Sequence, residues 1–397
     1  MDGPPIENGL VRVQASQLVE VEPKRPFSER EGIEDLGEVA IVPGFLNAHT
    51  HLEFSHFEQP ITPALPFTDW IGSVVRSRRG TETSPQTSLK KGFRESHLAG
   101  TVALAEIATE GWTFDSFNDP CYQGIVFREV LGFQSDRIEP GLETAETFLK
   151  STFCNSRLRQ GLSPHAPYSV HPQLFEGLME LAVRYRVPVA MHLAETKEEL
   201  EFLRFGTGPF REVLERLGVW EETSFFHGKK PLDYLERLFQ AVQSLVVHGN
   251  YLSPEELTFL GERRDRMAVV FCPRTHCYFE HSPYLLKAML EKKVKVLLGT
   301  DSRASNPNLS LYEEAQLIYQ STREAEWLSA ADLLNKITLE AAQVLGFQEH
   351  LGSLTPGKEA SFVVIQPGGN PQEPIEAQLL AEDARIKKVM LQGKWVS

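Results

Sequence analysis

The sequence predicts an α/β fold, a (β/α)₈ TIM barrel with a small β-sandwich domain built from both termini. Two patterns support this prediction. Apolar strand-like runs alternate with amphipathic helical stretches through most of the chain, and short strand patterns without such helices fill both ends. The length of 397 residues exceeds one ordinary domain, but a single large barrel with a small appendage accounts for it.

The two ends of the chain are expected to form the small domain together. Short apolar or alternating runs occur at residues 9–13, 18–21, 360–365 and 386–396. We therefore expect a β-sandwich built from residues 1–42 and 352–397, with the (β/α)₈ barrel over residues 43–351.

The middle of the chain contains about eight strand-like runs. The first ends at His51, and the others occupy residues 100–107, 124–130, 159–165, 187–192, 244–248, 268–273 and 294–301. Helical patterns occupy residues 172–185, 196–204, 209–217, 254–263, 309–325 and 330–345. In a barrel of this kind the active site lies at the C-terminal ends of the strands.

The composition is that of an ordinary globular protein, with 41% hydrophobic and 24% charged residues. A net charge of −14 argues against a nucleic acid polymer as partner, since such binding needs clustered Lys and Arg. The four scattered cysteines predict reduced thiols. No apolar run has the length of a membrane helix, and the first residues lack a signal pattern. We therefore expect a cytoplasmic protein that does not bind membranes.

His49 and His51 end the first strand-like run. Alternate side chains of a strand share a face, so both imidazoles can reach one point. Such a pair alone is weak evidence for a metal, because it also arises by chance. However, His165, His192, His248 and Asp301 end the fourth, fifth, sixth and eighth runs. A barrel gathers these strand ends on one rim, so together they predict a metal site.

The donor types limit the choice of metal. Imidazole nitrogens with one carboxylate suit Zn²⁺, Fe²⁺ or Mn²⁺, and zinc is the favoured ion. One ion is favoured over two, because His165 stands where a bridging carbamylated Lys would be expected.

Glu195 lies three residues after His192, within expected reach of the same cleft. A carboxylate beside a metal-activated water can accept a proton and pass it to a departing nitrogen. The alternative interpretation is that its charge only stabilises the start of the following helix.

Seven stretches carry a resemblance to a known family: PGFLNAHTHLEFS, SPHAPYSV, MHLAET, VVHGNYL, FCPRTH, GTDSRASN and LGSLTPGKEASFVVI. In this order and spacing the chain resembles the metal-dependent amidohydrolase superfamily, in its deaminase and chlorohydrolase branch. The resemblance extends from Gly9 to Val396, and family members usually have a further strand before the equivalent of residue 6. Glu53 and the GTDSRASN stretch resemble the aminodeoxyfutalosine deaminase-like subgroup, which deaminates the adenine ring of a modified nucleoside.

The resemblance implies site roles. The implied metal ligands are His49, His51, His192 and Asp301. The implied catalytic residues are Glu195 as proton shuttle, His248 as a weak ligand or a holder of the attacking water, and Asp301 as acceptor of a proton from that water. The implied chemistry is hydrolytic attack on an amidine-like ring carbon with loss of ammonia.

The expected substrate-binding residues are His165, Glu53, Trp70, His276 and Ser302. Trp70 could stack on a base, but its helical spacing also fits packing in the core. Residues 272–276 read Cys-Pro-Arg-Thr-His where many relatives carry a Ser-Asn ending, and this departure affects a loop expected to line the pocket.

We therefore expect an aminohydrolase acting on a small-molecule substrate, an adenine or purine nucleoside-like heterocycle. The alternatives are a chlorohydrolase, an amide or imine hydrolase using the same site, or an inactive barrel that serves as a binding protein. The presence of all the expected ligands disfavours the last. The oligomeric state is open, with a homodimer as one alternative.

Overall fold

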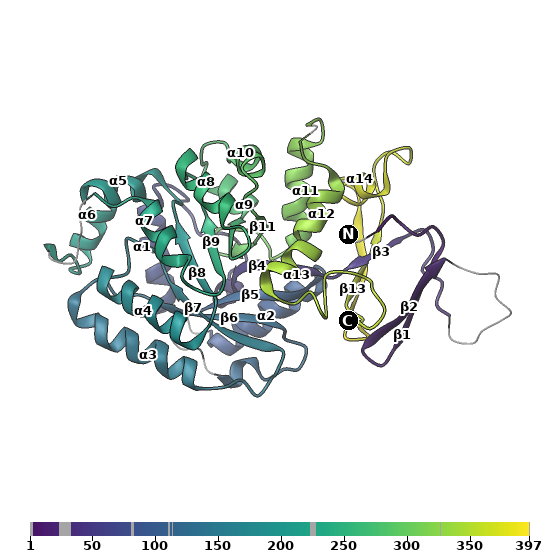
Figure 1. The fold of residues 1–397 in the computed structure, drawn as a ribbon, viewed down its shortest axis with the longest axis horizontal. Helices are drawn as coiled ribbons and strands as arrows, with labels where there is room; N and C mark the ends of the chain where they lie inside the picture. Colours follow the sequence, from purple (N-terminus) through teal and green to yellow (C-terminus); the bar gives the residue numbers. More distant parts are fainter. Residues whose placement is uncertain are drawn as a thin grey trace. The chain divides into compact units, whose positions relative to one another are not determined.

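The computed structural model describes residues 3–23, 33–80, 83–109, 112, 114–222, 228–325 and 327–396. The chain divides into two compact units, and most of their helices and strands are labelled in Figure 1. The first unit comprises residues 1–48, 93–104 and 309–397, and the second comprises residues 49–92 and 105–308.

The larger sheet has nine strands among the described residues, in the order β11-β10-β9-β8-β7-β6-β5-β4-β12. They are β4 (Phe45–His51), β5 (Thr101–Ala108), β6 (Gly124–Val130), β7 (Leu158–Pro164), β8 (Val189–Leu193), β9 (Ser244–His248), β10 (Met267–Phe271), β11 (Val296–Leu298) and β12 (Asp301–Ser302). From β6 to β11 the neighbouring strands run parallel, as do β12 and β4. Strands β8, β9 and β10 are buried along their whole length, as is typical of a parallel sheet covered on both faces. The α/β class is confirmed.

The strand expected over residues 294–301 is interrupted at Gly299 and Thr300. Strand β11 pairs with β10, and β12 pairs with β4. The amide of Gly299 donates to the carbonyl of Phe271, and the amide of Thr300 donates to the carbonyl of His49. The consecutive residues Gly299 and Thr300 therefore bond to two different neighbouring strands, Gly299 to β10 and Thr300 to β4.

Fourteen helices lie in the described residues. They are α1 (Phe67–Gly80), α2 (Pro85–Leu98), α3 (Ile138–Lys150), α4 (Pro172–Tyr185), α5 (Lys197–Phe205), α6 (Pro209–Arg216), α7 (Pro231–Leu238), α8 (Pro254–Glu262), α9 (Pro273–Tyr278), α10 (Leu286–Glu291), α11 (Leu311–Thr322), α12 (Ala330–Lys336), α13 (Leu339–Leu345) and α14 (Ile375–Leu379). Three short 3₁₀ helices, η1 (Leu52–His56), η2 (Phe114–Phe117) and η3 (Ser135–Arg137), connect other elements.

Local sequence explains where helices begin and end. Helix α8 begins with a capping box, in which the Ser253 hydroxyl accepts from the Glu256 amide and the Glu256 carboxylate accepts from the Ser253 amide. The single helix predicted over residues 330–345 is wrong, because the structure has α12 and α13 there. Thr338 breaks the helix with φ −125° and ψ −99°, and its hydroxyl donates to the Leu334 carbonyl over 2.7 Å.

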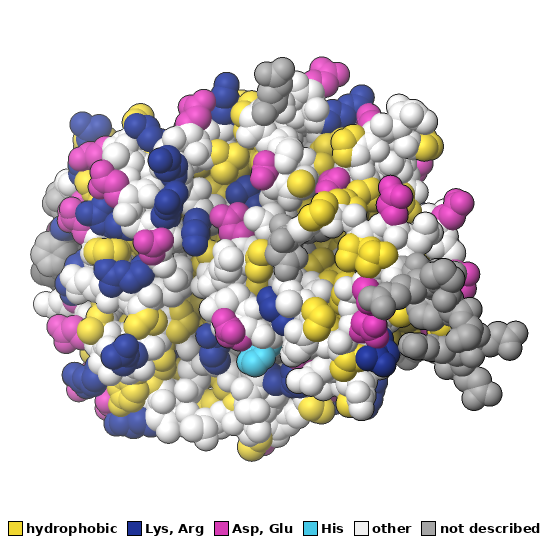
Figure 2. Space-filling model, turned by 45° about the vertical axis from the view of Figure 1, so that its right-hand side comes forward, with side chains coloured by type: hydrophobic (Ala, Val, Ile, Leu, Met, Phe, Trp, Pro, Cys, Tyr) yellow, Lys and Arg dark blue, Asp and Glu magenta, His cyan; other side chains and the backbone are white. Residues whose placement is uncertain are grey.

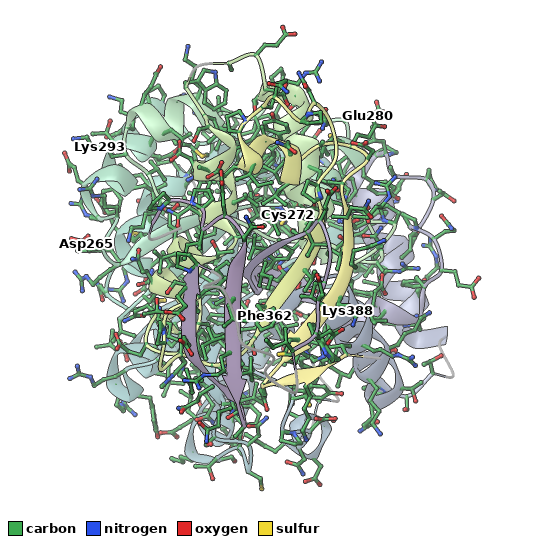
Figure 3. The ribbon with its side chains drawn as sticks, turned by 90° about the vertical axis from the view of Figure 1, so that its right-hand side faces the viewer. Asp265, Cys272, Glu280, Lys293, Phe362 and Lys388 are labelled. Atoms are coloured by element: carbon green, nitrogen blue, oxygen red, sulfur yellow. The ribbon has the colours of Figure 1, made fainter. Side chains whose placement is uncertain are left out.

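Strands from both ends of the chain lie side by side in a second sheet. Its order is β15-β14-β13-β3, and its strands are β3 (Ala40–Pro43), β13 (Phe362–Gln366), β14 (Arg385–Leu391) and β15 (Lys394–Trp395). All three pairings are antiparallel. Figure 3 looks onto this region, with Phe362 on β13 and Lys388 on β14 labelled.

The N-terminal hairpin, β1 (Gly9–Gln14) and β2 (Gln17–Pro23), forms a separate two-stranded sheet. It contacts the C-terminal segment, since the amide of Leu18 donates to the carbonyl of Lys358 over 2.9 Å. Leu18 is buried in a cluster with Phe362 and Val364. The expected meeting of the two chain ends is therefore observed at these strands.

The surface and the helices agree with the composition. On the face shown in Figure 2, Lys and Arg side chains are interspersed with Asp and Glu. No helix in the described part of the chain is long and apolar enough to cross a membrane. No disulfide joins the four cysteines, all of which lie in described segments.

Candidate metal centre and active site

His49 and His51, at the end of β4, both approach the carboxylate of Asp301. Their Nε2 atoms lie 3.6 and 3.8 Å from Asp301 Oδ1. The strand pairing explains this approach, since β12 runs beside β4 with Asp301 opposite Thr50. All three side chains are buried. The predicted convergence of these residues is therefore observed.

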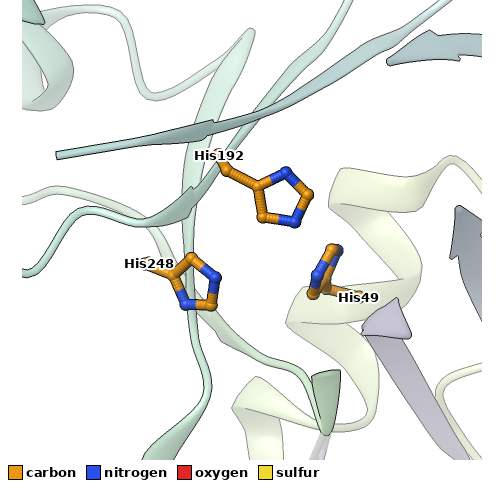
Figure 4. A group of neighbouring side chains, drawn as sticks. All are labelled: His49, His192 and His248. Atoms are coloured by element: carbon orange, nitrogen blue, oxygen red, sulfur yellow. The ribbon is translucent and has the colours of Figure 1, made fainter. Parts of the chain in front are cut away.

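Strands β8 and β9 add His192 and His248 to the same cluster. The Nε2 atom of His192 lies 3.3 Å from that of His51. Candidate donor atoms of His49, His192 and His248 lie within 4.8 Å of one another, as do those of His49, His51 and Asp301. Figure 4 shows the rings of His49, His192 and His248 gathered around one space.

This donor set fits a divalent metal ion. Burial lowers the pKa of His51, His192 and His248 well below the ordinary value, and neighbouring imidazoles lower it further. Neutral imidazoles offer lone pairs to a metal, whereas clustered imidazolium ions would repel one another.

A main-chain atom fixes the orientation of His192. Its Nδ1 atom lies 2.9 Å from the carbonyl oxygen of His165, at the end of β7. A carbonyl only accepts, so Nδ1 carries the hydrogen and Nε2 keeps its lone pair for the cluster.

Glu195 lies beside this cluster. Its Oε1 atom is 3.3 Å from Nε2 of His248, and its side chain is 6% exposed. Burial raises the pKa of Glu195 well above the ordinary value, and the charges of Asp301 and Glu199 raise it further. The Glu195 carboxyl group is therefore protonated more readily than an exposed glutamate.

Two residues that sequence reasoning missed hold the backbone of Glu195. The carboxylate of Glu199 accepts from the amides of Ala194 and Glu195, over 2.8 and 2.9 Å. The side-chain amide of Asn250 donates to the Glu195 carbonyl over 2.9 Å. Ala194 has a left-handed backbone with φ +54°, a conformation that costs free energy for a residue with a Cβ. These bonds stabilise the turn that directs Glu195.

His165 lies on another side of the cluster, with Glu53 and Arg78. The Nδ1 atom of His165 lies 2.6 Å from the Ser169 hydroxyl, and burial lowers the pKa of His165 to about 3. Glu53 pairs with Arg78 of α1 and accepts from the Thr109 hydroxyl over 2.9 Å.

Glu129 also lies here, 3.9 Å from Nε2 of His165 and 3.8 Å from the Arg78 guanidinium. Sequence reasoning missed both Glu129 and Arg78. Glu129 falls at the end of the third predicted strand, so the strand-end criterion that selected the histidines could have found it. No comparable signal marks Arg78 on its helix.

The remaining expected substrate-binding residues have protein contacts. The indole nitrogen of Trp70 donates to the Ala304 carbonyl over 3.3 Å, and its ring packs against Phe67 and Phe279. His276 contacts the Asn250 side chain at 3.2 Å, and the Ser302 hydroxyl accepts from the Ala304 amide over 3.2 Å.

Four imidazoles and one carboxylate converge at the strand ends of an α/β sheet. This set of donors is typical of metal-dependent hydrolases. The chain belongs to the amidohydrolase family, whose sequence profile matches residues 40–396.

Individual relatives agree with this assignment. The chain is 28% identical over 415 residues to a 5-methylthioadenosine/S-adenosylhomocysteine deaminase of Bacillus cereus, covering 98% of this chain and 89% of that protein. The aminofutalosine deaminase of Helicobacter pylori, solved with methylthio-coformycin, superposes with a TM-score of 0.77 at 22% identity, over 96% of this chain and 94% of that one. The zinc complex of atrazine chlorohydrolase from Arthrobacter aurescens gives a TM-score of 0.72 at 19% identity, over 97% and 89%. The two solved structures share the fold of this chain.

Proposed function

We propose that the protein is a metal-dependent aminohydrolase that removes ammonia from an adenine nucleoside-like heterocycle. The observation that supports the proposal is the position of the buried Glu195 carboxyl group, 3.3 Å from Nε2 of His248. The names of the Bacillus and Helicobacter relatives support the substrate class.

In this proposal His49, His51, His192 and Asp301 hold one zinc ion. Zinc is chosen because the donor set suits it and because the Arthrobacter chlorohydrolase was solved with zinc. A single ion is chosen because the three groups of candidate donors overlap, two of them sharing His49 and two of them sharing His192. When bound, such an ion acts as a Lewis acid and lowers the pKa of a water molecule.

The side chains around the donors move the protons. We assign to Asp301 the acceptance of a proton from the attacking water, and to Glu195 the delivery of a proton to the leaving nitrogen. Burial lowers the pKa of His248, so its neutral ring can orient the water or the substrate through a hydrogen bond. His165, Glu53, Trp70, His276 and Ser302 stay proposed substrate contacts.

We also propose that the large sheet closes as a (β/α)₈ barrel. With β11 and β12 counted as one interrupted strand the sheet has eight strands, and that strand pairs with β10 on one side and β4 on the other. The proposed β-sandwich consists of residues 1–42 and 352–397, with the barrel at residues 43–351. The antiparallel pairing of β3 with β13 supports this division.

A second candidate keeps the site and changes the leaving group. The similarity in fold to the Arthrobacter chlorohydrolase favours chloride over an amide or imine nitrogen as this second leaving group. Loss of chloride would not need a proton from Glu195, because chloride leaves as a stable anion.

The test is ammonia release by the zinc-loaded protein from adenosine, 5-methylthioadenosine, cytosine and aminotriazines, with chloride release from a chlorotriazine measured in parallel. We expect ammonia from at least one adenine nucleoside. Chloride release without ammonia release would replace the proposal by the second candidate.

A further inference from the structure

Tyr168 places a hydroxyl group without a protein partner beside the proposed active site. The residue lies in the turn after β7, three positions beyond His165, and is 6% exposed. Its hydroxyl has no hydrogen-bond partner among the described residues, yet the oxygen is not sealed from solvent. The hydroxyl of a buried tyrosine usually has a hydrogen-bond partner, so this one is available to a ligand.

Aromatic neighbours hold the ring of Tyr168 in place. The ring stacks on Phe210 of α6, with the ring centroids 4.0 Å apart and the planes inclined by 22°. Phe67 of α1 and Phe202 of α5 belong to the same buried cluster. Because this packing exists without a ligand, the hydroxyl has a defined direction before a ligand binds, and binding need not order the side chain.

His165 connects Tyr168 to the donor cluster. The ring of His165 lies edge-on to that of Tyr168, with centroids 5.8 Å apart, and its centroid is 4.9 Å from that of His192. The His165 side chain is 23% exposed, so it also borders accessible space. Two polar side chains that a ligand can reach therefore lie next to each other, one of them against a proposed metal ligand.

The surrounding charges show which catalytic group is near the Tyr168 hydroxyl. Burial raises the pKa of Tyr168 well above the ordinary value, and the charge of Glu195 raises it further. Smaller effects come from Glu199, Glu129 and Asp301. Because such effects fall off with distance, the hydroxyl lies on the Glu195 side of the site. The same charges keep the hydroxyl protonated, so it can donate a hydrogen bond.

We propose that Tyr168 contacts the substrate, with its hydroxyl donating a hydrogen bond to an acceptor nitrogen in the ring of the heterocycle. The inference rests on the proposed function, which supplies such a ring. Glu195 is assigned to the leaving nitrogen, which is attached to the ring, so a hydroxyl near Glu195 faces the ring rather than the sugar. A ring nitrogen without hydrogen only accepts, which matches a hydroxyl that donates.

The test compares the binding of inosine with that of 3-deazainosine and 7-deazainosine. These nucleosides carry no amino group to be removed, and each analogue replaces one acceptor nitrogen of the ring by carbon. Calorimetry on the zinc-loaded full chain should show that one analogue binds about 3- to 10-fold more weakly than inosine, the effect of one neutral hydrogen bond. Tyr168→Phe should weaken inosine binding by the same factor and should bind that analogue as tightly as inosine.

Tyr122→Phe is the matched control. Tyr122 is also 6% exposed, but it precedes the start of β6 and so lies at the opposite end of the strands from the donor cluster. This variant should keep the wild-type affinities. Tyr168→Phe retains the stacked ring, so its thermal unfolding and zinc content should match those of the wild type. A loss of affinity then reports the hydroxyl alone.

Three outcomes would overturn the inference. The first is a wild-type protein that binds all three nucleosides equally or binds none. The second is a Tyr168→Phe variant that binds inosine as tightly as the wild type. The third is a Tyr168→Phe variant that still discriminates against the weaker analogue, because another group would then hold that nitrogen. A preference that Tyr168→Phe removes, in a protein that releases no ammonia from any adenine nucleoside, would contradict the proposed function and leave the Tyr168 contact standing.

Discussion

The Oε1 atom of Glu195 lies 3.3 Å from Nε2 of His248, and both side chains are almost completely buried. These residues come from the segment after β8 and from the end of β9, two neighbouring parallel strands. A buried carboxyl group and a ring that can accept or donate a hydrogen bond therefore stand together beside His49, His51, His192 and Asp301.

Glu195→Gln should abolish most turnover while the metal is retained. Glutamine preserves the size of the side chain but cannot transfer a proton, and such transfer contributes about 10²- to 10⁴-fold to a rate. Steady-state ammonia release and metal content per chain check the prediction. Glu198→Gln, a matched change in helix α5, should stay active. Unchanged turnover in Glu195→Gln would remove this residue from the mechanism.

Asp301→Asn should reduce both metal retention and rate. The carboxylate lies 3.6 Å from His49 and accepts from the Ser305 hydroxyl over 3.0 Å, so the change removes the negative charge of the cluster without removing its anchor. Changes around metal ligands cost about 10- to 100-fold in affinity, and a ligand should cost no less. Chelator competition measures the affinity. A fully metallated, active variant would refute both roles of Asp301.

Glu199→Gln should lower both stability and rate without removing metal. Glu199 accepts from two backbone amides, and a glutamine side chain has one oxygen to offer them. Loss of one buried bond should lower the free energy of unfolding by about 1–3 kcal/mol. The turn that holds Glu195 should loosen, so kcat should fall. Denaturant unfolding and kinetics check this, and a variant with wild-type kcat would show that Glu199 does not position Glu195.

Acid should destabilise the metal-free protein through its buried imidazoles. Burial lowers the pKa of folded His192 well below the ordinary value of 6.5, so below that pH the unfolded chain binds a proton that the folded chain does not. The contribution of His192 is therefore present above about pH 6.5 and is lost as the pH falls.

Denaturant unfolding of the chelated protein at about pH 7.5 and about pH 5.5 tests this prediction. Buried carboxyl groups with raised pKa values, such as Glu195, oppose the trend, so His192→Asn is the necessary comparison. The loss of stability between the two pH values should be smaller in that variant. An equal loss in both proteins would contradict the role given to His192.

Much of the fold could be predicted because its signals are local. The helix predicted over residues 254–263 is observed as α8, since Ser253, Pro254 and Glu256 define its start within four residues. The two-helix structure of residues 330–345 was not predictable in the same way. The break lies at Thr338, whose backbone is not helical, and the apolar spacing of the two helices continues through it.

The site residues also separate into those that a local sequence pattern predicts and those that depend on tertiary contacts. His49, His51, His192, His248 and Asp301 converge because parallel strands end together, a regularity that the sequence pattern reveals. Arg78 and Asn250 could not be selected this way. Arg78 reaches Glu129 from helix α1, and Asn250 reaches the Glu195 carbonyl through its side chain, so each depends on tertiary packing.

The bond between His192 and residue 165 has an evolutionary consequence. The partner of the His192 ring is the main-chain oxygen of residue 165, and every amino acid has that atom. The side chain at this position can therefore change to suit a new substrate while the orientation of the neighbouring donor stays the same. A protein built this way can diversify its chemistry at the cleft and inherit its metal centre unaltered.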